Sequence, residues 1–200
     1  MNAAVIATTF GIVFLAELPD KTALASLVLA TKYRALDVFV GAAGGFAVQV
    51  AIALAAGELL SLLPHRTLEA IVAALFLLGA FLIFRHGRED EAQAESEAEE
   101  AARDAKPGNG TWRAMLTSFT VITIAEFGDL TQIVTANLAA KYDWLPVGIG
   151  ALVALWAVAA LAILGGQALL RFISLTWITR VAAVIMAVLA VISLVSAIRG

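Results

Sequence analysis

Six long apolar stretches constrain the fold of this 200-residue chain more than any other feature. A helix crosses the hydrocarbon core of a bilayer with about 20 apolar residues, and each stretch is about long enough to do so. Hydrophobic residues make up 62% of the chain, well above the roughly 45–50% of soluble domains. The sequence therefore predicts an all-α integral membrane protein with six transmembrane helices. The stretches lie at about 4–30, 36–62, 67–85, 114–139, 145–171 and 177–198.

A charged segment at residues 86–113 separates the first three stretches from the last three. Together with Arg85 it holds eight acids and five bases. Such a charge run is most simply a solvated connector, although an acidic tether can also gather cations. We therefore predict a first three-helix repeat at 1–85, an acidic linker at 86–113, and a second three-helix repeat at 114–200.

The two halves repeat each other at a fixed offset of 109 positions. The clearest repeated segments are E-L-P-D-K-T at residues 17–22 and E-F-G-D-L-T at residues 126–131. An odd number of spans in each half makes the second half enter the membrane from the opposite side, so we expect inverted repeats with a site near the midplane. The residues related by the offset include Glu17 and Glu126, Asp20 and Asp129, Thr22 and Thr131, Gly41 and Gly150, and Gly57 and Gly166.

Basic residues are divided unevenly between the two predicted sides of the membrane. Apart from Lys21, nine of the 12 Lys and Arg residues lie on the side that carries the linker, and three lie on the other side. Cytoplasmic loops carry the excess of positive charge, so we predict a cytoplasmic linker with both termini outside.

Each repeated segment places a Glu and an Asp three residues apart within an apolar stretch. Residues with this spacing lie on the same face of a helix. Glu17 and Asp20 can therefore point toward one place, and so can Glu126 and Asp129. A carboxylate at membrane depth costs several kcal/mol and marks a candidate functional site. If the repeats face each other, four carboxylates converge, and they cannot all stay charged unless protons or a metal ion balance them. The site would therefore hold either protons or a divalent cation.

The composition of the segments favours a hard cation. Pro19 and Gly128 weaken the helices beside the acids, which frees backbone carbonyls. These carbonyls, the carboxylates and the hydroxyls of Thr22 and Thr131 would form an all-oxygen ligand set, which Mn²⁺, Ca²⁺ and Mg²⁺ prefer. The chain has no Cys and only two His, which disfavours a dedicated Zn²⁺, Cu⁺ or Ni²⁺ site.

Simpler structural interpretations exist for several of these side chains. Glu17 and Lys21 are spaced i,i+4 and could neutralise each other. This interpretation does not extend to the second half, where Leu130 replaces the Lys. The hydroxyls of Thr22 and Thr131 could bond back to their own helices instead of contributing to the site.

Three further polar residues lie within the apolar stretches. They could support the site or form hydrogen bonds between helices, and the second interpretation is the simpler one. These residues are Gln49, Gln132 and Asn137.

The two acidic segments resemble the paired E-x-G-D-K/R-T/S signatures of the Golgi manganese/calcium–proton exchanger family, which is also named for a Gcr-dependent translation factor. The resemblance implies antiport of Mn²⁺ or Ca²⁺ against protons, with the motif acids as the ion site and the motif Thr residues beside them. The chain departs from the signature at Pro19, where the family usually has Gly, and at Leu130, where it usually has Lys or Arg. The resemblance also implies a multi-pass prokaryotic inner-membrane protein that exports Mn²⁺.

We therefore expect a secondary active transporter and not an enzyme. Its expected partners are the divalent cation and the lipid bilayer, with no bound cofactor and no nucleic acid, and a homo-oligomer is left open. One alternative is a proton-coupled exporter of a small organic solute, in which the acids carry protons only. A second is an intramembrane hydrolase with two Asp residues as a general acid/base dyad.

Overall fold

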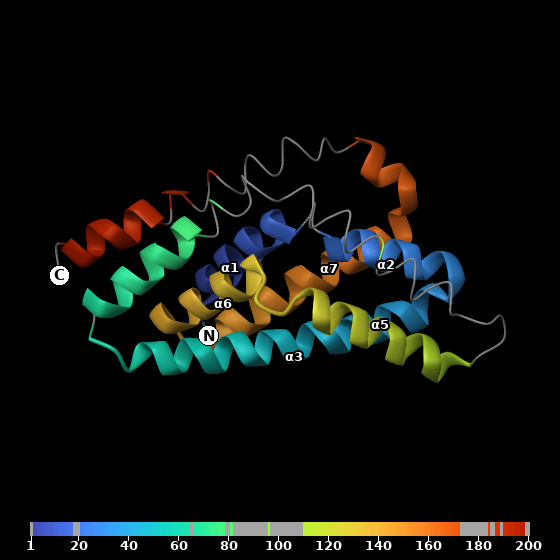
Figure 1. Cartoon of the computed structure of the whole chain (residues 1–200), viewed down its shortest axis with the longest axis horizontal. Coiled ribbons are helices and arrows are strands. Elements are labelled where there is room, and N and C mark those ends of the chain that lie inside the picture. The colour runs from blue at the N-terminus through green and yellow to red at the C-terminus, as the bar shows by residue number, and fades with distance from the viewer. Residues whose placement is uncertain are drawn as a thin grey trace.

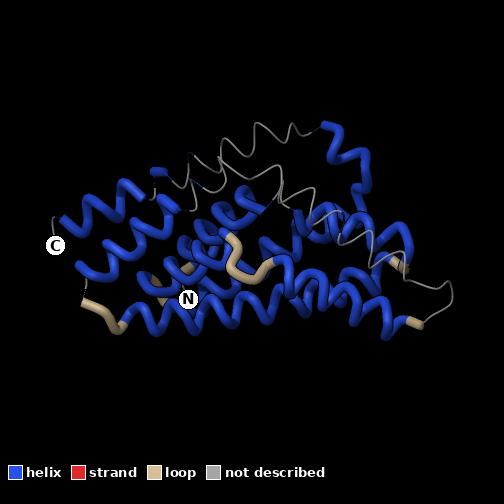
Figure 2. The backbone as a smooth tube through the Cα atoms, in the orientation of Figure 1, coloured by secondary structure: helices blue, strands red, loops and turns tan. Residues whose placement is uncertain are grey.

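The computed structural model describes residues 2–17, 21–64, 66–78, 110–172 and 190–198, together with residues 81, 96, 184, 187 and 188. All of these residues lie in helices or in the short loops that join them, and none lies in a strand (Figure 2). The long helices are α1 (Ala3–Glu17), α2 (Lys21–Lys32), α3 (Ala35–Ser61), α5 (Thr111–Ala125), α6 (Leu130–Lys141) and α7 (Trp144–Phe172). Residues 66–78 and 190–198 are also helical.

Two helices in the described part of the chain are long and apolar enough to cross a membrane. They are α3, with 27 residues, and the first 22 residues of α7. The full helices α3 (35–61) and α7 (144–172) agree at both ends within one residue with the predicted spans 36–62 and 145–171. Large apolar side chains such as Leu36, Leu59 and Leu164 are exposed on them, as a lipid environment allows. The all-helical architecture is therefore consistent with the predicted membrane protein.

The predicted span 114–139 is wrong as one continuous helix, whereas within the predicted span 4–30 residues 18–20 lie outside the described residues. In the first half α1 ends at Glu17 and α2 begins at Lys21. In the second half α5 ends at Ala125 and α6 begins at Leu130. The second acidic segment therefore stands at a helix break, where the expected weakening becomes a full interruption of the helix.

The second break has a clear backbone cause at Gly128, whose φ of +76° lies in the left-handed region that favours glycine. The N–H of Phe127 bonds to the carbonyl of Ile124, and the N–H of Asp129 bonds to the carbonyl of Glu126. These tight turn bonds replace the regular helical ones.

Of the other predicted segments, most of the linker 86–113 and parts of the spans 67–85 and 177–198 lie outside the described residues.

The long helix of each half packs on the shorter helices of the other half. Figure 1 shows α5 and α6 lying along α3, and α1 packs on α7. Glycines mark the closest approaches, because a Cβ at Gly41 would collide with the carbonyl of Met115, and one at Gly150 would collide with the carbonyl of Ile6. Both contacts are related by the offset of 109 positions. These glycines therefore let the backbones of the paired helices approach each other closely.

Lys141, at the end of α6, joins three segments that are distant in the sequence. Its Nζ lies 2.8 Å from Glu69 Oε2 and 3.0 Å from Ser193 Oγ. The Glu69 side chain is only 5% exposed and that of Lys141 24%. The ion pair therefore ties the helix at 66–78 to the second broken span and to the helix at 190–198.

We expect Glu69→Leu to destabilise the protein by about 2–3 kcal/mol, because it leaves a partly buried ammonium without its counter-charge. Adding Lys141→Met to Glu69→Leu should recover part of this loss. Thermal unfolding in detergent, followed by tryptophan fluorescence, measures both effects. Lys32→Met is the matched control, since Lys32 is the corresponding residue of the first half and is exposed. A double variant less stable than the single one would contradict the assignment.

Candidate cation site

Three of the four predicted acids converge. One carboxylate oxygen from each of Glu17, Glu126 and Asp129 lies within 4.8 Å of the others. Glu17 is the last residue of α1, Glu126 directly follows α5, and Asp129 directly precedes α6. Glu17 and Glu126 are completely buried. The acids of both halves therefore meet where the helix ends meet, whereas Asp20, the fourth predicted acid, lies outside the described residues.

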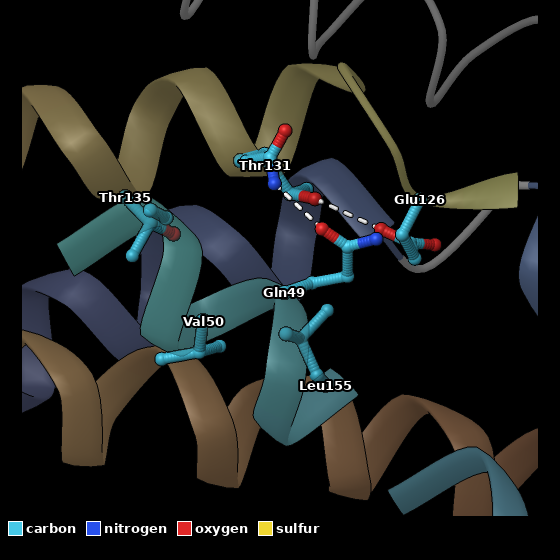
Figure 3. Close-up of a pocket in the computed structure, with 8 residues that line it drawn as sticks. Gln49, Val50, Glu126, Thr131, Thr135 and Leu155 are labelled. Carbon is cyan, nitrogen blue, oxygen red and sulfur yellow. Dashed lines mark hydrogen bonds between the residues drawn. The ribbon is translucent and has the colours of Figure 1, made fainter. Parts of the chain in front are cut away.

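The two motif threonines bond to the motif glutamates. Thr22 Oγ1 donates to Glu17 Oε1 at 2.8 Å, and Thr131 Oγ1 donates to Glu126 Oε2 at 3.4 Å (Figure 3). Each hydroxyl thus reaches back to the acid five residues earlier. Of the two interpretations left open by the sequence, the hydroxyls contact the site and do not bond back to their own helices.

Gln49 and Gln132 lie at the second break, and Asn137 does not contact it. Gln132 Nε2 donates to Gln49 Oε1 at 2.6 Å. Asn137 is buried further along α6, and neither of its side-chain polar atoms has a hydrogen-bond partner among the described residues. Lys21 begins α2, but its side chain is not described, so its predicted pairing with Glu17 stays a prediction.

A recess opens beside Glu126, between α3, α6 and α7 (Figure 3). It includes Thr135, which sequence reasoning missed. The available signal was its spacing, because Thr135 lies four residues after Thr131 and so on the same helix face. The lining residues are Gln49, Val50, Ala53, Glu126, Thr131, Gln132, Thr135 and Leu155.

The donor set suits a hard cation. Only oxygen atoms are presented by the three acids and the two threonines, and Mn²⁺, Ca²⁺ and Mg²⁺ prefer oxygen. Glu17 Oε2 is buried and receives no hydrogen bond from any described residue. A buried acceptor needs a partner, and in this cluster of acids a bound proton or a cation can supply it. The cluster can therefore exchange bound protons for a metal ion.

We expect Gly128→Ala to destabilise the second acidic turn by about 1–2 kcal/mol, because the left-handed conformation costs a residue with a Cβ about this much free energy. Nothing lies within 4 Å of an added Cβ there, so the cost comes from the backbone alone. Gly11→Ala is the matched control: it also meets open space, but it lies within α1, where Ala is favoured by about 0.5–1 kcal/mol. Unfolding midpoints should move in opposite directions, and two shifts of the same sign would contradict this account.

Comparison with known proteins places the chain in a family. The family model for the divalent cation/proton antiporter GDT1 matches residues 5–91 and 114–200, two ranges that begin and end 109 residues apart. No solved structure matches the chain.

Among relatives, the GDT1-like protein sll0615 of Synechocystis sp. is 30% identical over 164 residues, which cover 78% of this chain and 80% of that protein. The chloroplastic protein PAM71 of Arabidopsis thaliana is 29% identical over 186 residues, covering 84% of this chain but 50% of its own length. The GDT1-like protein 3 of the same plant is 25% identical over 182 residues, covering 84% of this chain and 62% of its own length. The chain thus spans about half the length of PAM71. With both of its halves matched by the family model, the chain belongs to the divalent cation/proton antiporter family GDT1, whose members are membrane transporters and not enzymes.

Proposed function

We propose that this protein exports Mn²⁺, and Ca²⁺ as a second substrate, in exchange for protons at the cluster of buried acids. The convergence of Glu17, Glu126 and Asp129 within 4.8 Å carries this proposal. Three like charges so close together in a buried place are strongly destabilised unless a cation or protons neutralise them. Asp20 completes the proposed ligand set by its place in the repeat.

The exchange follows from competition for the same oxygens. A divalent cation that enters from the cytoplasm displaces protons from the acids and is released on the other side, where protons return to the carboxylates. The hydroxyls of Thr22 and Thr131 can donate to the acids when no metal is bound, and their oxygens can turn toward a cation when one is present. Alternating exposure of the acids to the two sides makes the protein a secondary active transporter.

We propose a topology of six membrane spans in two inverted repeats, in a prokaryotic inner membrane. The linker lies in the cytoplasm and both termini lie outside. The shared offset of the two family matches supports the repeat, as do the corresponding glycine contacts of α3 with α5 and of α7 with α1. No disulfide or native thiol interferes with a test, because the chain has no cysteine.

We expect a cysteine introduced at Gly108, in the linker, to react with a membrane-impermeant maleimide only from the cytoplasmic side. A cysteine at Leu62, which follows α3 and is 78% exposed, should react only from the outside. Intact cells and inverted vesicles distinguish the two cases. Labelling of both positions from one side would overturn the inverted topology.

The transport experiment uses the purified protein in proteoliposomes with an imposed pH gradient. Mn²⁺ should accumulate in the compartment that loses protons, and a protonophore should abolish the accumulation. Ca²⁺ in the same assay gives the relative preference. Proton movement without any dependence on Mn²⁺ or Ca²⁺ would overturn the proposal in favour of a proton-coupled exporter of an organic solute. The recess beside Glu126 has a cavity volume of only about 10 Å³, which is about the room that one water molecule needs, and this small volume favours an ion over an organic solute.

A further inference from the structure

The break in the second half leaves two backbone groups without helical partners. The N–H of Phe127 bonds to Ile124 and so does not reach the carbonyl of Thr123. The N–H of Gly128 lies in the turn, beyond the end of α5. Backbone groups that are not satisfied cost several kcal/mol at membrane depth. Something outside the turn has to bond to both of them if the acids are to stay in place.

Two glutamines bond to both groups and to each other. The N–H of Gly128 donates to Gln132 Oε1 at 2.9 Å, Gln132 Nε2 donates to Gln49 Oε1 at 2.6 Å, and Gln49 Nε2 donates to the carbonyl of Thr123 at 2.5 Å. A backbone N–H can only donate and a carbonyl can only accept, so both amide orientations are fixed by the ends of the chain of bonds. We call this pair of side chains, Gln49 and Gln132, the amide clasp.

The clasp encloses the acidic turn. Its two backbone ends, Thr123 and Gly128, lie on either side of Glu126, and Asp129 follows directly. Gln49 comes from α3, in the other half of the chain, and is 3% exposed. The clasp therefore fixes the second acidic turn relative to a long helix of the first half.

The positions that the repeat relates to the clasp do not carry the residues of an equivalent clasp. The offset of 109 positions relates Gly128 to Pro19, Gln132 to Ala23 and Gln49 to Val158. Proline has no N–H, so the donor that Gln132 satisfies in the second half does not exist in the first. The second repeat has both the glycine N–H and the two amide side chains that bond to the turn, and the first repeat has neither at the corresponding positions. These differences therefore belong together.

Resting on the proposed function, we propose that Gln49 and Gln132 act together as positioning residues that set the affinity of the site for its cation. They hold the second acidic turn in the geometry that the ion requires. Ca²⁺ accepts irregular and longer coordination, whereas smaller ions require closer and more regular ligands. Loosening the clasp should therefore weaken the binding of Mn²⁺ more than that of Ca²⁺.

The test is a double-mutant cycle with Gln49→Met, Gln132→Met and the double variant. These changes keep similar side-chain length and remove the hydrogen bonds. We expect each single variant to raise the Kd for Mn²⁺, measured by calorimetry in detergent, about tenfold. The transport KM should rise in parallel while kcat changes less than about twofold. The double variant should be no worse than either single one, because the two amides act as a unit.

Val158→Met is the matched control, since Val158 occupies the position of Gln49 in the other repeat and does not line the recess. It should leave the Kd for Mn²⁺ unchanged. If the Met variants do not fold, Gln49→Asn, which keeps the amide but shortens its reach, is measured instead and should show a smaller rise.

Additive losses, an unchanged Kd, or an equal loss for Ca²⁺ and Mn²⁺ would overturn the clasp and leave the proposed function intact. A wild-type protein that binds Mn²⁺ but does not exchange it for protons would overturn the proposed function instead.

Discussion

Glu126→Gln is expected to reduce Mn²⁺/H⁺ exchange at least about 100-fold while leaving a folded protein. The amide keeps the shape of the side chain and can still accept from Thr131, but it loses the negative charge. Removing one charge from a buried site for a divalent ion costs more than the ~3 kcal/mol that correspond to a 100-fold loss. The amide also cannot carry a transported proton, so both halves of the exchange fail together.

Glu17→Gln should give a loss of similar size, because Glu17 holds the corresponding position in the first half and is equally buried. The proteoliposome assay measures both variants, and tryptophan fluorescence checks that they fold. Glu58→Gln is the control, since Glu58 is an exposed glutamate at the far end of α3 and should transport normally. Full activity in either buried variant would disprove the assignment of these acids as ligands.

Gly41→Ala is expected to lower the thermal midpoint by about 6–12 °C. The added methyl would meet the backbone carbonyl of Met115 on α5, and a backbone in a packed helix pair cannot move aside as a side chain can. Overpacking costs about 1–3 kcal/mol, and we place this variant at the upper end, where each kcal/mol corresponds to about 2–4 °C for a chain of this size.

Gly44→Ala is the matched control one turn further along α3. Its added methyl would approach only the ring of Phe119, at 3.3 Å, and a side chain can shift by the few tenths of an ångström that are needed. Unfolding in detergent gives both midpoints. Equal shifts for Gly41→Ala and Gly44→Ala would mean that the close approach of α3 and α5 does not limit stability.

The parts of the fold that follow from uniform apolar runs could be predicted from the sequence. The ends of α3 and α7 agree with the predicted spans within one residue, because lipid-compatible length is encoded in the run itself. The break after Ala125 was predicted only as a weakening of the helix, because the sequence does not report the φ of Gly128. The apolar stretch resumes directly after the acidic turn, so hydropathy alone indicates one long span.

The convergence of the acids was predicted from the repeat, in which the chain is compared with itself, and their role as an ion site stays a prediction. This comparison identified Glu17 and Glu126 as partners before any coordinates, and they do lie together. Contacts that exist in only one half gave no such signal. The bond between Gln132 and Gln49 and the ion pair of Lys141 with Glu69 each join residues more than 70 positions apart, and neither has a counterpart at the offset positions. Asp20 stays a prediction.

The exchange of partners between the two halves has a consequence for biosynthesis. Since α3 packs on α5 and α1 packs on α7, the first repeat emerges from the ribosome before either partner has been translated. Its glycine-lined helix surface therefore has no packing partner, and contacts lipid or the insertion machinery, until the second repeat has been inserted. A gene cut between the repeats should therefore yield two fragments that are each degraded when expressed alone and that persist when they are co-expressed.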